Sequence, residues 1–299
     1  MKPIDQTLST SLDRFQPALV EISAKLDPCS LCPRHCKSHR RDNQHGFCGV
    51  GAAPRVSSAG PHFGEESILV GSGGSGTIFF SGCNLGCVFC QNADISHGRR
   101  GRDLTVDQLV EIMLNLQRLG CVNINLVSPS HFAAPIAEAI VKARRRRLSL
   151  PIVYNTGGYD DLETLRLLDG MIDIYMPDMK FATPDSAEKC ASARDYPEVN
   201  RAAVLEMHRQ VGDLEIRDGL AVHGLLVRHL VLPDDLAGSA AILDFLATSV
   251  SPTAAVNVMA QYHPCHHAFE DPTLRLQPSA RHIYNLRSYA ASLSLRLID

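Results

Sequence analysis

The chain has 299 residues and a formal net charge of −3, with 45% hydrophobic and 20% charged residues. This composition is ordinary for a globular protein, and it excludes a general electrostatic attraction to nucleic acid. No apolar run is long enough to span a bilayer, and the N-terminal residues lack the apolar core of a signal peptide. We therefore expect a cytoplasmic protein with no membrane or nucleic-acid partner, in which clustered cysteines are metal ligands rather than disulfides.

Residues 5–26 carry apolar side chains at loosely helical spacing, which predicts a short amphipathic helix packed on the body of the protein. Residues 27–75 are rich in Cys, Gly, Pro and His with little periodicity, which indicates a small segment that is loop-rich or stapled by a metal. Four residues in it form a C-x2-C-x3-C-x11-C pattern: Cys29, Cys32, Cys36 and Cys48. Four thiolates at this spacing predict one metal centre, either tetrahedral zinc or a closed four-iron cluster.

From residue 76 onward, strand-like and helix-like patterns alternate. The predicted strands cover 76–81, 122–127, 151–155, 172–177, 225–232 and 256–262, and several are continuously apolar, as buried parallel strands are. The predicted helices cover 105–119, 132–147, 161–168, 198–211 and 236–249. The alternation predicts a parallel α/β sheet, without separating a partial barrel from a doubly wound sheet. We place the boundary between an N-terminal segment, 1–75, and an α/β domain, 76–299, just before the first of these strands.

Three further cysteines, Cys83, Cys87 and Cys90, follow the first predicted strand in a C-x3-C-x2-C run. Thiolates this close together converge on one soft metal centre, either zinc or an iron–sulfur cluster. Structural zinc sites and ferredoxin clusters normally use four ligands. Three thiolates leave one iron of a four-iron cluster open, and an open iron can chelate a substrate. The run therefore indicates a catalyst rather than an electron carrier.

The string from Gly76 to Asn92, GTIFFSGCNLGCVFCQN, resembles the signature of the radical S-adenosylmethionine (SAM) superfamily. It is most similar to the uncharacterised branch described as homologous to pyruvate formate-lyase activating enzyme. The resemblance implies a (β/α)6 partial TIM barrel with an N-terminal cysteine-rich metal-binding extension. It also implies a [4Fe–4S] cluster on Cys83, Cys87 and Cys90, reductive cleavage of SAM to a 5′-deoxyadenosyl radical, and a reduced flavodoxin- or ferredoxin-type electron donor. The radical would abstract hydrogen from a substrate, such as a glycine of a partner glycyl radical enzyme.

In such folds a ligand site is expected at the carboxyl ends of the parallel strands. Where the activating enzymes carry Gly-Gly-Glu-Pro, this chain has Ser128-Pro129-Ser130 without a carboxylate, so a serine hydroxyl would take the SAM amino group. The positions that the resemblance assigns to SAM are Phe89, Ser128, Ser130, Asn155, Asp178, Lys180, Arg228 and His263. Three of them also have an ordinary structural reading: core packing for Phe89, a turn for Asn155 and a salt bridge for Arg228.

The roles of several other residues stay open. His131 could take part in function or could be a residue without a role at the start of a helix. Cys265 and His266 could face substrate, bind a metal or be idle loop residues. Residues 62–66 are a polar loop of unknown role, and Cys121 is expected in the core.

Two other functions compete with activation of a glycyl radical enzyme. A radical SAM enzyme that modifies a peptide or a small molecule fits the same residues. A non-catalytic zinc- or iron–sulfur-binding module would carry basic patches with interleaved aromatic residues, but Phe47 is the one aromatic residue near Cys29–Cys48, so we favour an enzyme. For that four-cysteine set the metal stays open, with a lean toward iron–sulfur because related activating enzymes carry cysteine-rich cluster inserts.

Overall fold

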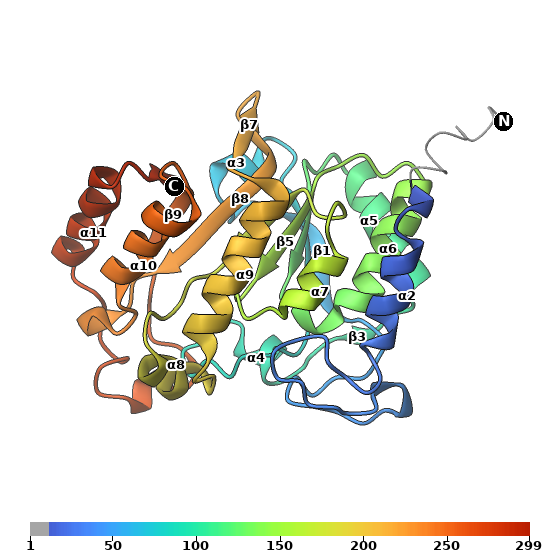
Figure 1. Ribbon diagram of the computed structural model, residues 1–299, viewed down its shortest axis with the longest axis horizontal. Coiled ribbons are helices and arrows are strands. Elements are labelled where there is room, and N and C mark those ends of the chain that lie inside the picture. The colour runs from blue at the N-terminus through green and yellow to red at the C-terminus, as the bar shows by residue number, and fades with distance from the viewer. Residues whose placement is uncertain (1–11) are drawn as a thin grey trace.

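The computed structural model describes residues 12–299. The first part of the helix predicted over 5–26 therefore lies outside the described residues. The rest forms α2 (Gln16–Ala24), which packs against α6 (Ala133–Arg145) and α7 (Leu162–Leu167) and buries Ile22 completely. The helix thus lies on the body of the protein, as Figure 1 shows.

A central sheet organises the fold (Figure 1). Its parallel strands, in spatial order, are β10 (Arg296–Leu297), β9 (Ala255–Met259), β8 (Leu220–Leu230), β6 (Ile174–Pro177), β5 (Ile152–Thr156), β4 (Ile124–Val127) and β2 (Ser75–Phe80). All six predicted strands are present, and β10 extends the row at one edge. The result is a mixed α/β fold with a central parallel sheet, compatible with the partial barrel that the resemblance implies.

Three further strands were not predicted. β1 (Arg55–His62) runs antiparallel to β2 and carries β3 (Arg102–Asp103) on its other side. β7 (Glu215–Arg217) forms a hairpin with β8, which therefore begins at Leu220 and not at residue 225. The β1 sequence, RVSSAGPH, is small, polar and interrupted by Gly and Pro, so it lacks the alternation that marks a strand. Residues 55–62 form a strand because their backbone pairs with β2, which is a tertiary contact.

Helices connect the strands along the chain. Those close to prediction are α5 (Val106–Arg118), α6, α7, α9 (Tyr196–Val211) and α10 (Ser239–Phe245), which continues into a π-helical turn at Leu246–Val250. α8 (Pro184–Ala191) and α11 (Ala280–Ser292) were not predicted, and the remaining short segments are α3 (Ser67–Val70), α4 (Ala93–Ser96) and 3-10 turns at 40–42, 130–132, 233–235 and 266–270. Thr105 and Gln108 form a capping box at the start of α5. Across residues 12–299, no helix is long and apolar enough to cross a membrane.

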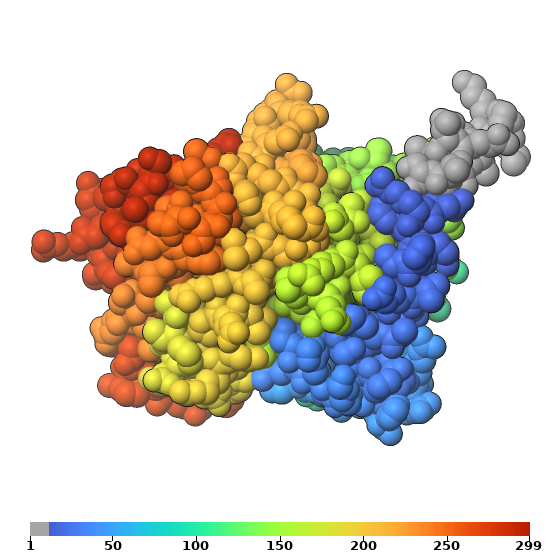
Figure 2. All heavy atoms as spheres, viewed as in Figure 1, coloured from blue at the N-terminus to red at the C-terminus, as the bar shows by residue number. Residues whose placement is uncertain are grey.

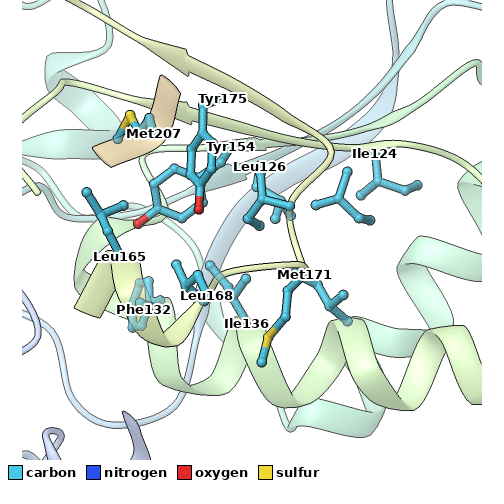
Figure 3. Close-up of a cluster of buried hydrophobic side chains, with 14 of the residues drawn as sticks. Ile124, Leu126, Phe132, Ile136, Tyr154, Leu165, Leu168, Met171, Tyr175 and Met207 are labelled. Atoms are coloured by element: carbon cyan, nitrogen blue, oxygen red, sulfur yellow. The ribbon is translucent and has the colours of Figure 1, made fainter. Parts of the chain in front are cut away.

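One face of the sheet packs against helices to form the main core (Figure 3). Leu126, Tyr154 and Tyr175 stand side by side on neighbouring strands and point toward this face. Successive side chains along a strand point to opposite sides of the sheet, so the residues next to them in sequence face the other side. Leu126 and the two tyrosines meet Ile136 of α6 and Met207 of α9, and all five side chains are buried. Burial of each large apolar side chain stabilises the fold by about 1.5–3 kcal/mol.

The opposite face of the sheet encloses a second apolar cluster at the amino ends of the strands. Val153, Ile174 and Leu226 point inward there and pack around Leu69 of α3, which is fully buried. The amide of Asn123, just before β4, donates to the carbonyl of Leu69 at 2.8 Å and fixes α3 against the strand ends. With the amino end filled, open space on this face is left toward the carboxyl end.

Candidate functional site

A cavity of about 650 Å³ lies on the inner face of the sheet toward the carboxyl ends of the strands. Residues of β2, β4, β5, β8 and β9 line it, together with the loops that follow β1, β2 and β6. The volume is in the range of a small-molecule site. Most of the residues that the sequence assigned to one site are found here: Cys83, Cys87, Phe89, Cys90, Ser128, Ser130, Asn155, Asp178, Lys180 and Arg228.

The three cysteines of the C-x3-C-x2-C run all line this cavity. Burial raises the pKa of Cys83 to about 11 and that of Cys87 to about 12. The backbone N–H of Leu85 donates to the sulfur of Cys83 at 3.3 Å, and the positive charge of Lys180 also favours the thiolates. Without a metal the thiols of Cys83 and Cys87 stay protonated near neutral pH, whereas a bound metal would hold them as thiolates.

The loop that carries these cysteines is held in place by its backbone. The N–H groups of Gly86 and Val88 donate to the carbonyls of Ala191 and Cys190 at 3.1 and 2.9 Å. These acceptors end α8, so the unpredicted helix serves as the support for the cysteine loop. The three sulfurs thereby face a single space, and a set of soft thiolates on one cavity fits an iron–sulfur cluster with an open iron.

Lys180 forms a tight ion pair with Asp178 inside the cavity, with 2.6 Å between Nζ and Oδ2. Burial alone would lower the pKa of Lys180, but the charges of Asp178 and Cys87 outweigh it and raise that pKa above its usual range. The Tyr196 hydroxyl accepts the backbone N–H of Lys180 at 3.1 Å and sits 2.9 Å from the carbonyl of Gly157. The lysine is therefore charged and fixed in position.

Phe89 and Ser130 combine a place on the cavity with a structural role. Phe89 is buried and makes edge-to-face contacts with Phe181 and Tyr262, at centroid distances of 6.2 and 5.9 Å. The hydroxyl of Ser130 lies 3.0 Å from Oγ1 of Thr156, which donates to a buried carboxylate, Asp160, at 2.7 Å. Both readings of Phe89 are compatible with this arrangement, and the Ser130 hydroxyl is already engaged by the scaffold.

Arg228 points into the cavity and is bound by two acidic side chains that the sequence reasoning missed. Its Nε donates to Glu66 at 2.9 Å, and its Nη2 contacts both Glu65 and Glu66. Asn257 of β9 also donates to Glu66 at 2.9 Å. Burial would raise the pKa of Glu66, but Arg228 and Asn257 hold that pKa below its ordinary value. The salt-bridge reading of Arg228 is thus satisfied inside the site.

The pairing of Glu65 and Glu66 with Arg228 had no local signal in the sequence. The acidic residues belong to the polar loop at 62–66, whose role was left open, and they stand more than 160 positions away from the arginine. Asn125 was also missed. It is fully buried on β4, and neither its amide nitrogen nor its carbonyl oxygen has a hydrogen-bond partner among the described residues.

Three histidines lie outside the cavity lining. His263 is exposed, with its Nδ1 3.5 Å from the side-chain nitrogen of Gln91, so it stands at the rim rather than in the lining. His131 is buried, with its Nε2 3.0 Å from the carbonyl of Ser81, and burial lowers its pKa to about 3. His131 lies in the turn just before α6, and a neutral, packed imidazole is compatible with the reading of His131 as a residue without a functional role. His266 stacks on His97 at 4.6 Å, outside the cavity.

The second cysteine set lies directly beside the first. In Figure 1 the segment between α2 and β1 occupies the same end of the molecule as α4, and Figure 2 shows it as a patch on the surface. Cys29, Cys32 and Cys48 are buried, whereas Cys36 is exposed. Burial raises the pKa of Cys32 to about 12, and Cys48, Cys29 and Cys36 contribute in the same direction.

Comparison with known proteins agrees with this geometry. The family model described as "Radical SAM superfamily" matches residues 77–236, which is more than half of the chain and includes β2 with its cysteine loop. The chain is also similar to the uncharacterized protein MJ0674 of Methanocaldococcus jannaschii. The two are 28% identical over 302 residues, covering 96% of this chain and 82% of that protein.

Proposed function

Because this chain belongs to the radical SAM superfamily, we propose that it cleaves SAM reductively in the cavity at Cys83, Cys87 and Cys90, and that the resulting radical abstracts hydrogen from a glycine of a partner protein. Membership of the superfamily implies a [4Fe–4S] cluster, SAM and an electron donor. The observation that carries the rest is the convergence of three thiols and a fixed lysine on one cavity.

In this proposal the chain's own residues bind SAM, orient it and shield the reaction from water. When bound, the cluster and SAM supply one-electron cleavage of a carbon–sulfur bond and an adenosyl radical. Lys180 uses one of its three N–H donors on Asp178, which leaves donors for a ligand carboxylate. Phe89 offers an aromatic surface for the adenine, and Ser128 and Asn155 offer polar groups at the neighbouring strand ends. Apolar side chains in the lining, such as Phe79, Phe89 and Leu230, would limit the access of water to a reactive species.

The open edges of the sheet favour a protein as the substrate. In the described chain the sheet runs from β10 to β3, and its two ends do not pair with each other. A cavity inside such an open sheet has room at its side for a loop of another protein. A donor of the reduced flavodoxin or ferredoxin class would supply the electron.

A peptide or small molecule is the second candidate substrate, and one observation favours it. The inner wall of the cavity carries a cluster of polar side chains: Glu65, Glu66, Arg228 and Asn257. Such a wall matches a small polar ligand better than the backbone of a glycine. The two substrates can be separated by adding either the small-molecule filtrate or the protein fraction of a cell extract and finding which of them raises 5′-deoxyadenosine production.

The test of the central proposal is an anaerobic assay for 5′-deoxyadenosine after reconstitution with iron and sulfide, with dithionite as reductant and SAM added. The triple variant Cys83→Ala/Cys87→Ala/Cys90→Ala should lose the product and about four irons per chain. Cys121→Ala, which changes a buried thiol outside the cavity, should match wild type. Iron-loaded wild type that makes no 5′-deoxyadenosine would overturn the proposal.

A further inference from the structure

We propose that Cys29, Cys32, Cys36 and Cys48 hold a second iron–sulfur cluster, that the buried guanidinium of Arg40 compensates its negative charge, and that electrons enter the active site through this cluster. The cluster and its compensating arginine are argued from this segment alone. The electron-entry role rests on the proposed function. A one-electron donor protein of the flavodoxin or ferredoxin class would reduce this cluster, which would then pass that electron to the centre at Cys83, Cys87 and Cys90.

Backbone N–H groups are aimed at the sulfurs of this set. In three cases the backbone N–H two residues after the cysteine donates to its sulfur. The Cys83 loop has the same pattern, with the N–H of Leu85 on Cys83. Donors of this kind favour thiolates, the form that binds metal. The three donors in the segment are Leu31, Arg34 and Ser38.

Arg40 is the observation that most directly indicates an anionic centre. Its side chain is only 1% exposed, yet no carboxylate among residues 12–299 pairs with it. It donates to the carbonyls of Gly51 and His131, and its Nη1 lies 3.8 Å from the sulfur of Cys29. A guanidinium is always charged, and a buried charge without a counter-charge is strongly destabilising. Four metal-bound thiolates next to it would provide the missing negative charge.

The second set is in contact with the first through the backbone. Gly82, just before Cys83, has a φ of +77°, and a Cβ there would lie 2.6 Å from the carbonyl oxygen of Cys48. Only glycine permits both that conformation and that approach. Arg34 adds a second link, because its Nε donates to the carbonyl of Asn84 at 2.9 Å. The two cysteine loops are therefore built to lie against each other.

The four cysteines differ in exposure, and this difference indicates the direction in which electrons would pass through the second cluster. Cys36 is exposed to solvent, whereas Cys48 is buried beside the Cys83 loop. A donor protein can approach the exposed side, and the buried side lies against the loop that carries Cys83. A zinc ion at the same position has no redox chemistry and would only staple the segment. The location between surface and cavity therefore favours iron–sulfur over zinc.

The experiment begins with metal content after anaerobic reconstitution in the presence of both iron and zinc. Wild type should hold about eight irons per chain and no zinc, and Cys32→Ala/Cys48→Ala about four. The rate of 5′-deoxyadenosine formation is then measured with reduced flavodoxin and, separately, with dithionite. The ratio of the first rate to the second should fall at least tenfold in the double variant. Zinc at the site, or an unchanged ratio, would overturn the proposal.

Arg40 is tested by the midpoint potential of the second cluster, followed by electron paramagnetic resonance. Arg40→Gln removes a positive charge and should lower that potential or release the cluster's iron, whereas Arg40→Lys should retain the iron. Arg41→Gln is the matched control, because Arg41 is exposed and bonds to Ser23. A wild-type potential and iron content in folded Arg40→Gln would refute the role of Arg40. Wild type that carries eight irons but makes no product with dithionite would count against the proposed function and leave the second cluster standing.

Discussion

Replacing Arg228 by Met should be among the most destabilising single changes in the cavity. The substitution removes the one guanidinium between two carboxylates, and the side chains of Arg228, Glu65 and Glu66 are only 15%, 8% and 2% exposed. Breaking a buried ion pair from one side typically costs about 3–5 kcal/mol, because the remaining charge stays buried. Glu66→Gln should cost less, about 1–3 kcal/mol, because Glu65 still neutralises the arginine.

A second ion pair of similar length provides the control. Arg217 and Glu215 are 2.7 Å apart, but their side chains are 72% and 51% exposed, so Arg217→Met should cost less than about 1 kcal/mol. Thermal unfolding followed by circular dichroism would show the difference. At roughly 2 °C per kcal/mol, Arg228→Met should lower Tm by about 6–10 °C and Arg217→Met by about 2 °C or less.

The same comparison has a pH dependence with a fixed sign. The pKa of Glu66 in the folded protein is below its ordinary value of 4.5, so its contribution is present above pH 4.5 and is lost as the pH falls below it. The gap in Tm between wild type and Arg228→Met should therefore narrow in acid. If Arg228→Met is no more destabilising than Arg217→Met near neutral pH, the burial argument is wrong.

The other predictions concern Lys180 and His131. Lys180→Met leaves Asp178 without its partner and should lower kcat/KM for SAM cleavage by about 10- to 150-fold, which corresponds to the loss of one charge-assisted hydrogen bond. The control, Lys189→Met, changes an exposed ion pair and should match wild type. Equal rates for the two variants would contradict the prediction. The pKa of His131 is held near 3 against an ordinary 6.5, so its imidazole stays neutral in the folded protein while the unfolded chain binds a proton. Wild type should then lose about 2 kcal/mol of stability from this residue between pH 7.5 and pH 5. The side-chain amide in His131→Gln can still donate to the carbonyl of Ser81, so this variant should not show that loss of stability between pH 7.5 and pH 5 when the free energy of unfolding is measured in urea. A pH dependence equal to that of wild type would argue against a buried neutral histidine.

The local order of the fold was legible in the sequence because it depends on short-range patterns. Apolar runs such as Ile172–Met176 and the capping residues around Thr105 identify elements within a few positions of their true ends. β1 was missed because its residues lack a strong period of their own, and it exists through pairing with β2. α8 does carry local helix signals that the prediction did not use, namely the Thr183 cap and Pro184 in its first turn.

The same division applies to the site. By itself, the sequence determined the three-cysteine run, the four-cysteine set and the placement of Asn155 and Lys180 at strand ends, since each follows from spacing and from the rule that parallel strands end at one edge. Only the tertiary structure decided that Glu65 and Glu66 meet Arg228, that His263 stands at the rim, and that Arg40 lies buried against Cys29. These contacts depend on which loops the folded sheet brings together, and the pairing of groups far apart in the chain leaves no periodic trace in the sequence.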